Sequence, residues 1–235
     1  MKKIILFLIA IPAAGILSAV EIVNFNRAGL GSVGSRKADV MKNSGYIWNF
    51  SDIRPLIADA GGTNSAVHGG FITSWSPDAK YDSKLRWYDE GFQLFVYPPL
   101  QDGYETAGKG ILVWNKTDFL AGAGKTATFS ADDKLSAIFT GISASTMDIR
   151  FVVRQGGVYY VSDAKKKGSG AELFSIKPAA VQWRTISTED YSIGNSPVNV
   201  EFTDVQGVGL YMNVSRKGNQ TNIKLKTFSA TATVK

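Results

Sequence analysis

Residues 148–154 read DIRFVVR, and residues 157–162 read GVYYVS. Polar and apolar residues alternate in the first stretch, where the apolar positions are Ile149, Phe151 and Val153. Successive side chains of a β-strand point to opposite faces of a sheet, so this alternation predicts a strand whose apolar side chains lie in a core. The polar side chains of the same strand are then expected in water. The stretch therefore favours a fold built from strands with one buried and one wet face.

The rest of the chain repeats this composition in short runs rich in Val, Ile, Phe, Tyr, Trp and Thr, separated by Gly, Asn, Asp and Ser. This pattern is typical of strands and turns. Helical character is confined to residues 35–42 and 51–60, and Pro55 interrupts the second segment. We therefore predict an all-β fold, a two-sheet antiparallel β-sandwich or jelly roll with little helix. The predicted strands are residues 21–26, 46–50, 92–97, 111–115, 126–130, 135–140, 148–154, 158–162, 181–187, 198–203, 208–214 and 223–234.

The last predicted strand changes the phase of its alternation. Ile223 and Leu225 share one face, but the next large apolar residue, Phe228, falls on the other face of a regular strand. A β-bulge between Lys226 and Phe228 would absorb one extra residue and return all three apolar side chains to the core. The alternative is a strand that ends and restarts at Thr227.

The five tryptophans fall into two groups. Three alternate with polar neighbours in predicted strands, so we expect them in the core: Trp48, Trp114 and Trp183. Trp75 and Trp87, together with Tyr81, lie within residues 61–90, where Gly, Ser, Asn and Asp predict long irregular loops. Loops on a rigid sandwich usually carry the binding surface. We therefore expect these three aromatic side chains to contact a ligand.

The N-terminal segment has the order of a signal peptide. Lys2 and Lys3 precede an apolar run and then small residues that end at Ala19. The run is shorter than the roughly 20 residues of a spanning helix, which favours cleavage over a retained anchor. We therefore predict a signal peptide over residues 1–19, no membrane span after cleavage, and a single β-sandwich domain over residues 20–235. A domain break near residues 115–124 is the alternative.

The composition excludes several kinds of site. The chain has no cysteine, so disulfides and thiolate metal sites are excluded. The single histidine, His68, cannot build a typical zinc site, and no Gly-x-Ser-x-Gly elbow occurs for a serine nucleophile. GLGSVG at residues 29–34 and GKT at 124–126 lack the strand and helix context of nucleotide-binding loops. We therefore predict no cofactor and no catalytic residue.

The formal net charge of +6 is a mild excess. A solvated surface explains it, and weak attraction to an acidic polysaccharide or an anionic envelope is the sharper interpretation. A nucleic-acid partner is not expected. The adjacent carboxylates Asp89–Glu90 and Asp132–Asp133 could serve glycoside cleavage. Acidic residues cluster at turns, however, so we expect both pairs to be structural.

Aromatic rings pack against the C–H face of a pyranose, and Arg, Asn, Gln and Asp side chains bond to its hydroxyl groups. Strand positions facing away from the core supply such polar groups, with Arg150 and Arg154 on one strand and Arg184 on another. The predicted ligand-binding residues are therefore Trp75, Tyr81, Trp87, Arg150, Arg154 and Arg184.

The strand rhythm of residues 110–234 is carried by the segments 148–154, 157–162, 208–212 and 223–230. It resembles the galactose-binding-like β-jelly rolls of exported bacterial proteins and carbohydrate-active enzymes. The resemblance implies a two-sheet jelly roll and sugar binding. Such modules often hold a structural calcium ion through a Glu/Gly/Asp cluster near the first strand. Here Glu21 is followed by Ile, Val and Asn, so the sequence supports no calcium site.

Fold, aromatic residues and polar strand positions together predict an exported, non-catalytic carbohydrate-binding or glycan-recognition protein. Its expected partner is a polysaccharide or a cell-surface glycan, and its expected location is secreted, periplasmic or cell-surface. A surface-structural or adhesive β-sandwich protein is one alternative. An exported glycosidase or polysaccharide lyase is the other.

Overall fold

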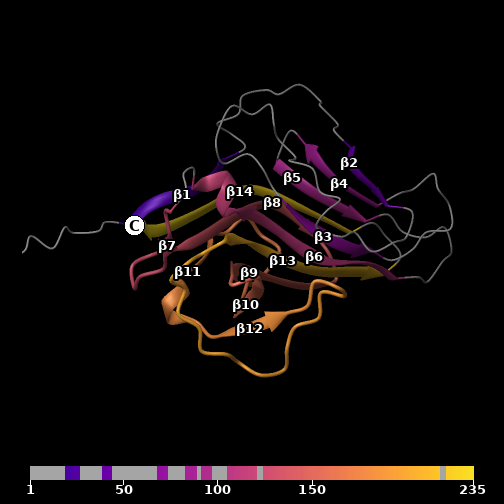
Figure 1. The fold of residues 1–235 in the computed structure, drawn as a ribbon. Helices are drawn as coiled ribbons and strands as arrows, with labels where there is room; N and C mark the ends of the chain where they lie inside the picture. Colours follow the sequence, from indigo (N-terminus) through magenta and orange to yellow (C-terminus); the bar gives the residue numbers. More distant parts are fainter. Residues whose placement is uncertain are drawn as a thin grey trace, which may run out of the picture.

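The computed structural model describes residues 19–26, 39–43, 68–73, 83–88, 91–96, 105–120, 124–217 and 221–235. These residues form two antiparallel sheets that lie one above the other (Figure 1). Helix in this part of the chain is limited to α1 (Lys116–Phe119) and a single 3-10 turn, Pro178–Ala180. The prediction of an all-β, two-sheet sandwich is confirmed.

Among the described residues, the larger sheet has eight strands and the smaller sheet has six. The larger sheet runs in the order β11 (Phe174–Ile176), β8 (Leu135–Ser143), β14 (Thr221–Val234), β5 (Gly91–Val96), β4 (Ser83–Tyr88) and β2 (Asp39–Asn43), and β1 (Ala19–Asn26) and β7 (Ala127–Thr128) also pair with β14. The smaller sheet runs in the order β12 (Trp183–Ile186), β10 (Val158–Lys165), β9 (Thr146–Gln155), β13 (Gly207–Lys217), β6 (Glu105–Asn115) and β3 (His68–Thr73).

Aromatic pairs join the two sheets across the core. Trp114 of β6 stacks on Phe228 of β14, with ring centroids 4.4 Å apart. Phe151 of β9 stacks in the same way on Phe174 of β11, also at 4.4 Å. Such pairs add stabilisation beyond the area they bury. Trp114 and Trp183 both lie in this core, as predicted, whereas Trp48 lies outside the described residues.

The phase change in the last strand is absorbed by a β-bulge. Leu225 pairs with Phe139 of β8 and Thr227 pairs with Ile138, so Lys226 is the extra residue. Leu225 and Phe228 both lie in the core, and Lys226 is exposed. The bulge is confirmed, one residue earlier than predicted, and β14 continues unbroken through it.

The predicted strand 198–203 is wrong. Val198 makes a single bridge to Trp183, and the residues after it join no ladder. The alternation is nevertheless real, because Phe202 is buried in the core while Glu201 is exposed. An alternation of polar and apolar residues indicates an extended chain with one buried side. It does not require that the chain pairs with a neighbouring strand.

Two other predictions fail because strand pairing overrides local composition. Residues 35–42, expected to be helical, overlap β2, which pairs with β4. The segment 61–90, expected to be irregular loop, contains both β3 and β4. The predicted strand 46–50 and the predicted helical segment 51–60 lie outside the described residues.

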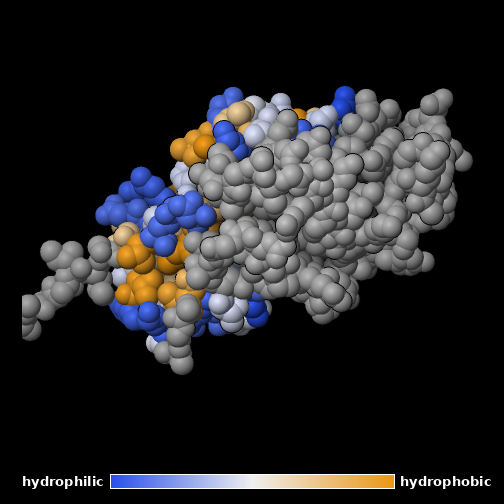
Figure 2. Space-filling view, turned by 90° about the horizontal axis from the view of Figure 1, so that it is seen from above, coloured by the Kyte–Doolittle hydropathy of each residue, from blue (hydrophilic) through white to orange (hydrophobic). Residues whose placement is uncertain are grey.

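The described surface mixes hydrophobic and hydrophilic residues when the molecule is seen from above (Figure 2). The exposed large hydrophobic side chains in the described ranges are Val20, Val158 and Leu173, which belong to three separate segments. Single exposed apolar side chains are normal for a protein surface. Within these ranges no helix has the length and apolar character needed to cross a membrane.

Candidate functional site

The outer face of the smaller sheet is not the wet surface that the sequence predicts. Val152 of β9 points away from the main core and is fully buried. It belongs to a second apolar cluster on this face, made of Ile111, Val113, Val152, Tyr159, Val161, Ile186, Tyr191 and Tyr211. The expectation of one buried and one wet face therefore fails for this sheet. The sequence pattern does not show that a later segment folds back over it.

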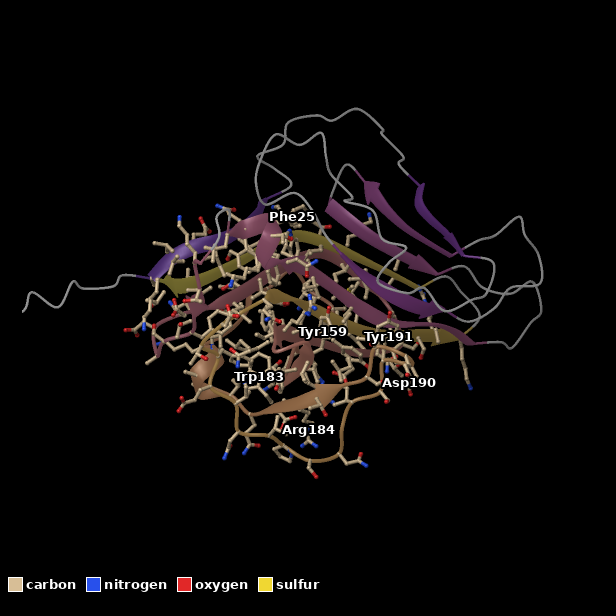
Figure 3. All side chains as sticks on the ribbon, viewed as in Figure 1. Phe25, Tyr159, Trp183, Arg184, Asp190 and Tyr191 are labelled. Carbon is tan, nitrogen blue, oxygen red and sulfur yellow. The ribbon has the colours of Figure 1, made fainter. Side chains whose placement is uncertain are left out.

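That segment is residues 187–195, named here the strap. The strap turns back along β12, and Ile193 forms an isolated β-bridge with Ile186. The Gly194 amide donates a hydrogen bond of 2.8 Å to the Thr185 carbonyl oxygen. Tyr191 lies at its tip and is 0 % exposed. Figure 3 shows Tyr191 near Tyr159, and both belong to the second apolar cluster. The strap thus closes the apolar cluster from outside.

Tyr191 holds an unusual backbone conformation, with a φ of 54°. Bulky residues rarely adopt a left-handed backbone, so the tip is strained. The Asp190 carboxylate stabilises the turn, because its Oδ1 accepts bonds from the Ser192 amide at 3.1 Å and the Ser192 hydroxyl at 2.8 Å. These bonds lower the pKa of Asp190, the hydroxyl bond being the larger cause.

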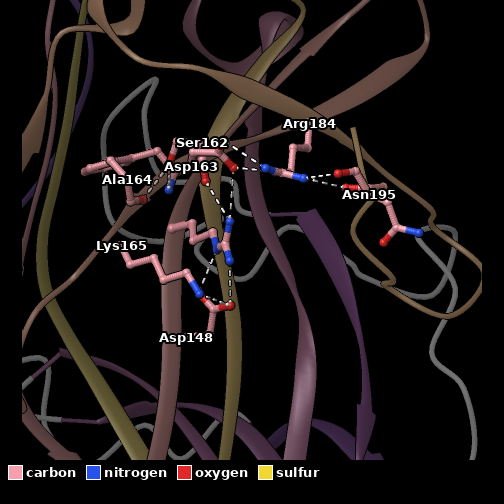
Figure 4. Close-up of polar contacts among 10 residues, drawn as sticks. Asp148, Ser162, Asp163, Ala164, Lys165, Arg184 and Asn195 are labelled. Carbon is pink, nitrogen blue, oxygen red and sulfur yellow. Dashed lines mark hydrogen bonds and ion pairs between the residues drawn. The ribbon is translucent and has the colours of Figure 1, made fainter. Parts of the chain in front are cut away.

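Beside the strap, charges of alternating sign form a chain that we name the ion network: Lys165, Asp148, Arg150, Asp163 and Arg184. Arg150 donates from Nε and Nη2 to the two Asp148 carboxylate oxygens at 2.7 and 2.9 Å. Lys165 Nζ lies 3.3 Å from the same carboxylate. Arg150 Nη1 lies 3.6 Å from Asp163 Oδ1. Arg184 Nε donates to Asp163 Oδ1 at 2.5 Å (Figure 4).

Three neighbouring strands position this network. Asp148 and Arg150 stand two residues apart on β9 and therefore share a face. Asp163 and Lys165 share a face of β10 in the same way, and Arg184 comes from β12. A register shift between Val161 and Lys165 lets β10 advance four residues while β9 advances two. This irregularity places Lys165 opposite Arg150.

Buried Ser162 holds the irregular part of β10 in place. Its hydroxyl donates to the Ala164 carbonyl oxygen at 2.8 Å and accepts the Phe151 amide at 3.2 Å. Its carbonyl oxygen accepts a bond of 3.2 Å from Arg150 Nη1. The Arg150 guanidinium is therefore held by the Asp148 carboxylate through two nitrogens and by the Ser162 carbonyl oxygen through the third.

A cavity of about 360 Å³, open to solvent, lies over the ion network. Its wall combines Arg150, Asp163, Lys165 and Arg184 with strap residues 193–195. Arg184 joins both parts of the wall, because it donates to the carbonyl oxygens of Gly194 and Asn195 as well as to Asp163. The hydrogen bond that Arg184 donates to the Asp163 carboxylate is the largest cause that raises the pKa of Arg184. We name this cavity the outer-face pocket.

The structure brings together two of the six predicted ligand-binding residues. Arg150 and Arg184 both line the outer-face pocket. Arg154 faces the same side but lies about 13 Å further along β9, with its guanidinium 5.4 Å from the centre of the Tyr159 ring. It is not part of the pocket wall.

The predicted aromatic residues are not found at this pocket. Trp75 and Tyr81 lie outside the described residues. The backbone of Trp87 lies in β4, paired with Phe92 of the larger sheet, and not in a loop as predicted. Sequence reasoning missed Asp163, Lys165 and the strap. Asp163 and Lys165 lie just beyond the predicted strand 158–162, in the last residues of β10, which the prediction ended too early.

The wall offers many N–H donors together with carboxylate acceptors, which suits the recognition of a hydroxyl-rich or anionic ligand. Among the described residues no group of three or more His, Cys, Asp or Glu side chains is placed to hold a metal ion. Of the carboxylate pairs, Asp133 accepts the Ser130 amide at 2.7 Å and Asp132 binds Lys177 at 3.1 Å, so both serve the turn before β8. Asp89 and Glu90 lie outside the described residues.

Comparisons with protein-family models, curated protein sequences and solved structures found no match for this chain. The resemblance to galactose-binding-like jelly rolls therefore stays a prediction. A function has to be argued from the pocket itself.

Proposed function

We propose that this chain is an exported, non-catalytic glycan-recognition protein, and that its ligand binds in the outer-face pocket. The observation that carries the proposal is a pre-formed, open pocket whose wall consists mainly of charged and amide groups. Sugar hydroxyl groups both donate and accept hydrogen bonds, so they match a wall with guanidinium donors and a carboxylate acceptor.

Rigid placement of the wall favours binding. The Arg150 side chain is only 9 % exposed and is bound by Asp148 and the Ser162 carbonyl oxygen. Arg184 is fixed by Asp163 and by the strap. Groups that are already ordered lose little conformational entropy when a ligand binds.

Blocking the pocket tests the proposal. Asn195 is exposed in the pocket wall, and Asn195→Trp should fill the cavity without disturbing the core. Exposed Asn199 lies outside the wall, so Asn199→Trp is the matched control. Both proteins and the wild type are applied to an array of oligosaccharides and polysaccharides.

We expect saturable binding by the wild type and by Asn199→Trp, and loss of binding by Asn195→Trp. Chromatography of the bound glycans should show no shortened products. Absence of binding to every glycan would favour a structural or adhesive protein, and release of products would favour a glycosidase or lyase. Equal binding by both variants would place the site elsewhere.

A further inference from the structure

The charges of the outer-face pocket do not balance. In the ion network the order is positive, negative, positive, negative, positive, so three cations face two carboxylates. The pocket wall itself holds Arg150, Lys165 and Arg184 but only the Asp163 carboxylate, since Asp148 is not one of the residues that line it. One negative charge from a ligand would complete the series.

Lys165 is the surplus cation. Arg150 and Arg184 each hold a carboxylate through two nitrogens, in contacts of 2.5 to 3.3 Å. Lys165 approaches Asp148 through a single contact of 3.3 Å, and Asp148 is already bound by Arg150. The Lys165 side chain is 52 % exposed. Its ammonium group is therefore the most exposed of the three cations in the pocket wall, since the Arg184 and Arg150 side chains are 25 % and 9 % exposed.

Arg150 can contribute to the same ligand. Its bonds to Asp148 and to the Ser162 carbonyl oxygen use three of the five N–H donors of a guanidinium. The side chain is held in one orientation by these bonds. A ligand carboxylate beside Lys165 would thus accept hydrogen bonds from the fixed Arg150 guanidinium and from the mobile Lys165 ammonium group. Such charge-assisted hydrogen bonds are stronger than hydrogen bonds between neutral groups.

The outer-face pocket has fewer groups that could bind a neutral sugar than groups that could bind an acidic one. Ile193 is the apolar residue in its wall. The tyrosines of this sheet face, Tyr159, Tyr191 and Tyr211, are at most 9 % exposed, and none of them lines the pocket. In the described part of the site a pyranose therefore finds no aromatic face on which to stack. Affinity has to come from polar and charged contacts.

We infer that the outer-face pocket binds the carboxylate group of an acidic glycan, a polymer containing uronic acid units, through Lys165 and Arg150. This inference rests on the proposed function and narrows its ligand class. The formal net charge of the chain is +6, and Lys2 and Lys3 of the predicted signal peptide supply two of these charges, so an excess of about +4 (6 − 2) remains to favour the approach of such a polymer.

The test compares each acidic polysaccharide with its own neutral derivative. Polygalacturonate, alginate and hyaluronan are used together with the same polymers after carboxyl reduction, which converts each carboxylate to a hydroxymethyl group. Binding to the full chain is measured by calorimetry at two salt concentrations. Poly-glutamate serves as an anionic polymer without sugar rings.

Two lysine variants locate the interaction. Lys165→Ala and Lys177→Ala each remove one half-exposed cation, with side chains 52 % and 47 % exposed. Each lysine has one carboxylate contact, at 3.3 and 3.1 Å, but Lys177 lies outside the pocket wall. Thermal melts of both variants should match the wild type, because exposed ion pairs contribute little to stability.

We expect at least one acidic polymer to bind, its reduced form to bind about tenfold more weakly, and added salt to weaken binding. Lys165→Ala should lower the affinity about tenfold and Lys177→Ala should leave it unchanged. Equal affinity for the reduced polymer would overturn the acidic class but keep glycan recognition. Binding of no polysaccharide at all would overturn the proposed function itself. If poly-glutamate bound as tightly as the acidic polysaccharide, or if both lysine variants lost the same affinity, the binding would be non-specific attraction between charges and the inference would be overturned.

Discussion

Gly209 shows how closely the backbones of β13 and β6 approach each other. A Cβ atom added at this position would lie 1.8 Å from the Leu112 carbonyl oxygen. Real atoms never come so close, and the oxygen belongs to the backbone of a paired strand. Gly141 on β8 provides a contrast, because a Cβ there would meet nothing within 4 Å.

We expect Gly209→Ala to lower the free energy of unfolding by about 1–3 kcal/mol or more, because two strands must move apart to admit the methyl group. Gly141→Ala should change it by less than about 0.5 kcal/mol, as substitutions without a steric conflict do. Urea denaturation followed by circular dichroism measures both. Similar midpoints for the two variants would contradict the close approach.

The burial of a single side chain could be predicted from the sequence where it depends only on the strand that carries it. Trp183 follows from alternation alone, because its neighbours Gln182 and Arg184 are polar. Trp114 does lie in the core, but its neighbour Val113 is apolar and buried in the second cluster, so alternation alone does not decide its face. The ion network does not follow in this way. Its five residues come from β9, β10 and β12, and a register shift in β10 brings them together. Nothing in one strand reports the register of the next.

At the scale of elements, the Gln155 side chain replaces a strand partner for the segment that follows Val198. Its Nε2 donates to the Glu201 carbonyl oxygen at 2.8 Å. Its Oε1 accepts the amides of Thr203 and Asp204, both at 2.8 Å. One side chain thus makes three bonds to the backbone of an extended segment that joins no ladder.

We name the three hydrogen bonds of the Gln155 side chain the clamp. Removing the clamp should loosen residues 201–204. We expect Gln155→Ala to cost about 1–3 kcal/mol, because the backbone groups of Thr203 and Asp204 lose their partner. Amide hydrogen exchange should become faster at these two residues and stay unchanged in β9. Exposed Gln182, which makes none of these bonds, supplies the control Gln182→Ala. Unchanged exchange at Thr203 and Asp204 in the Gln155 variant would refute the clamp.

β14 is the element on which the larger sheet depends. It pairs with β5 and then β1 along one edge, and with β8 and then β7 along the other. Its core side chains include Ile223, Leu225 and Phe228. No other described strand of this sheet has as many partners.

Deleting residues 223–235 should therefore abolish folding, because four strands lose ladder bonds and the core loses several side chains at once. The near-ultraviolet circular dichroism signal and the cooperative melt should both disappear. A matched change of the bulge residue, Lys226→Ala, should leave the melt intact, since Lys226 is exposed. A soluble truncated chain that still melts cooperatively would refute the role given to β14.

At the scale of the whole molecule, the outer apolar cluster links stability to alkaline pH. Burial raises the pKa of Tyr211 to about 12, and the negative charge of Asp148 adds to the effect. Burial also raises the pKa of Tyr191, with a smaller contribution from Tyr159, and the pKa of Tyr159, against the opposing charge of Arg154. The ordinary pKa of tyrosine is about 10.

These pKa values are higher in the folded than in the unfolded state, so folding holds the phenolic protons more tightly. The contribution to stability is complete below about pH 10 and is lost as the pH rises toward 12. We expect the free energy of unfolding to fall over this range, with tyrosinate absorbance at 295 nm appearing as the protein unfolds. Tyr211→Phe should make the fall shallower. An unchanged slope in that variant would contradict the linkage.

The sandwich class was predictable because strand periodicity recurs throughout the chain and the core needs two apolar faces. The strand order was not, since β1 pairs with β14 from the opposite end of the described chain. The second apolar cluster was also hidden. It depends on the strap reaching back over a face whose own residues, Asp148, Arg150 and Arg154, read as solvent-exposed.

The place of β14 in chain order also governs how the protein can fold. Among the described strands it is the last to leave the ribosome, yet it lies between four strands that precede it. Pairing β1 with β14 closes a loop that contains nearly every other described residue, and such long-range closure makes folding slow. Before β14 is made, the larger sheet lacks its centre and the chain stays open. For a chain that is exported, as proposed above, this interval leaves the polypeptide open while it crosses a membrane.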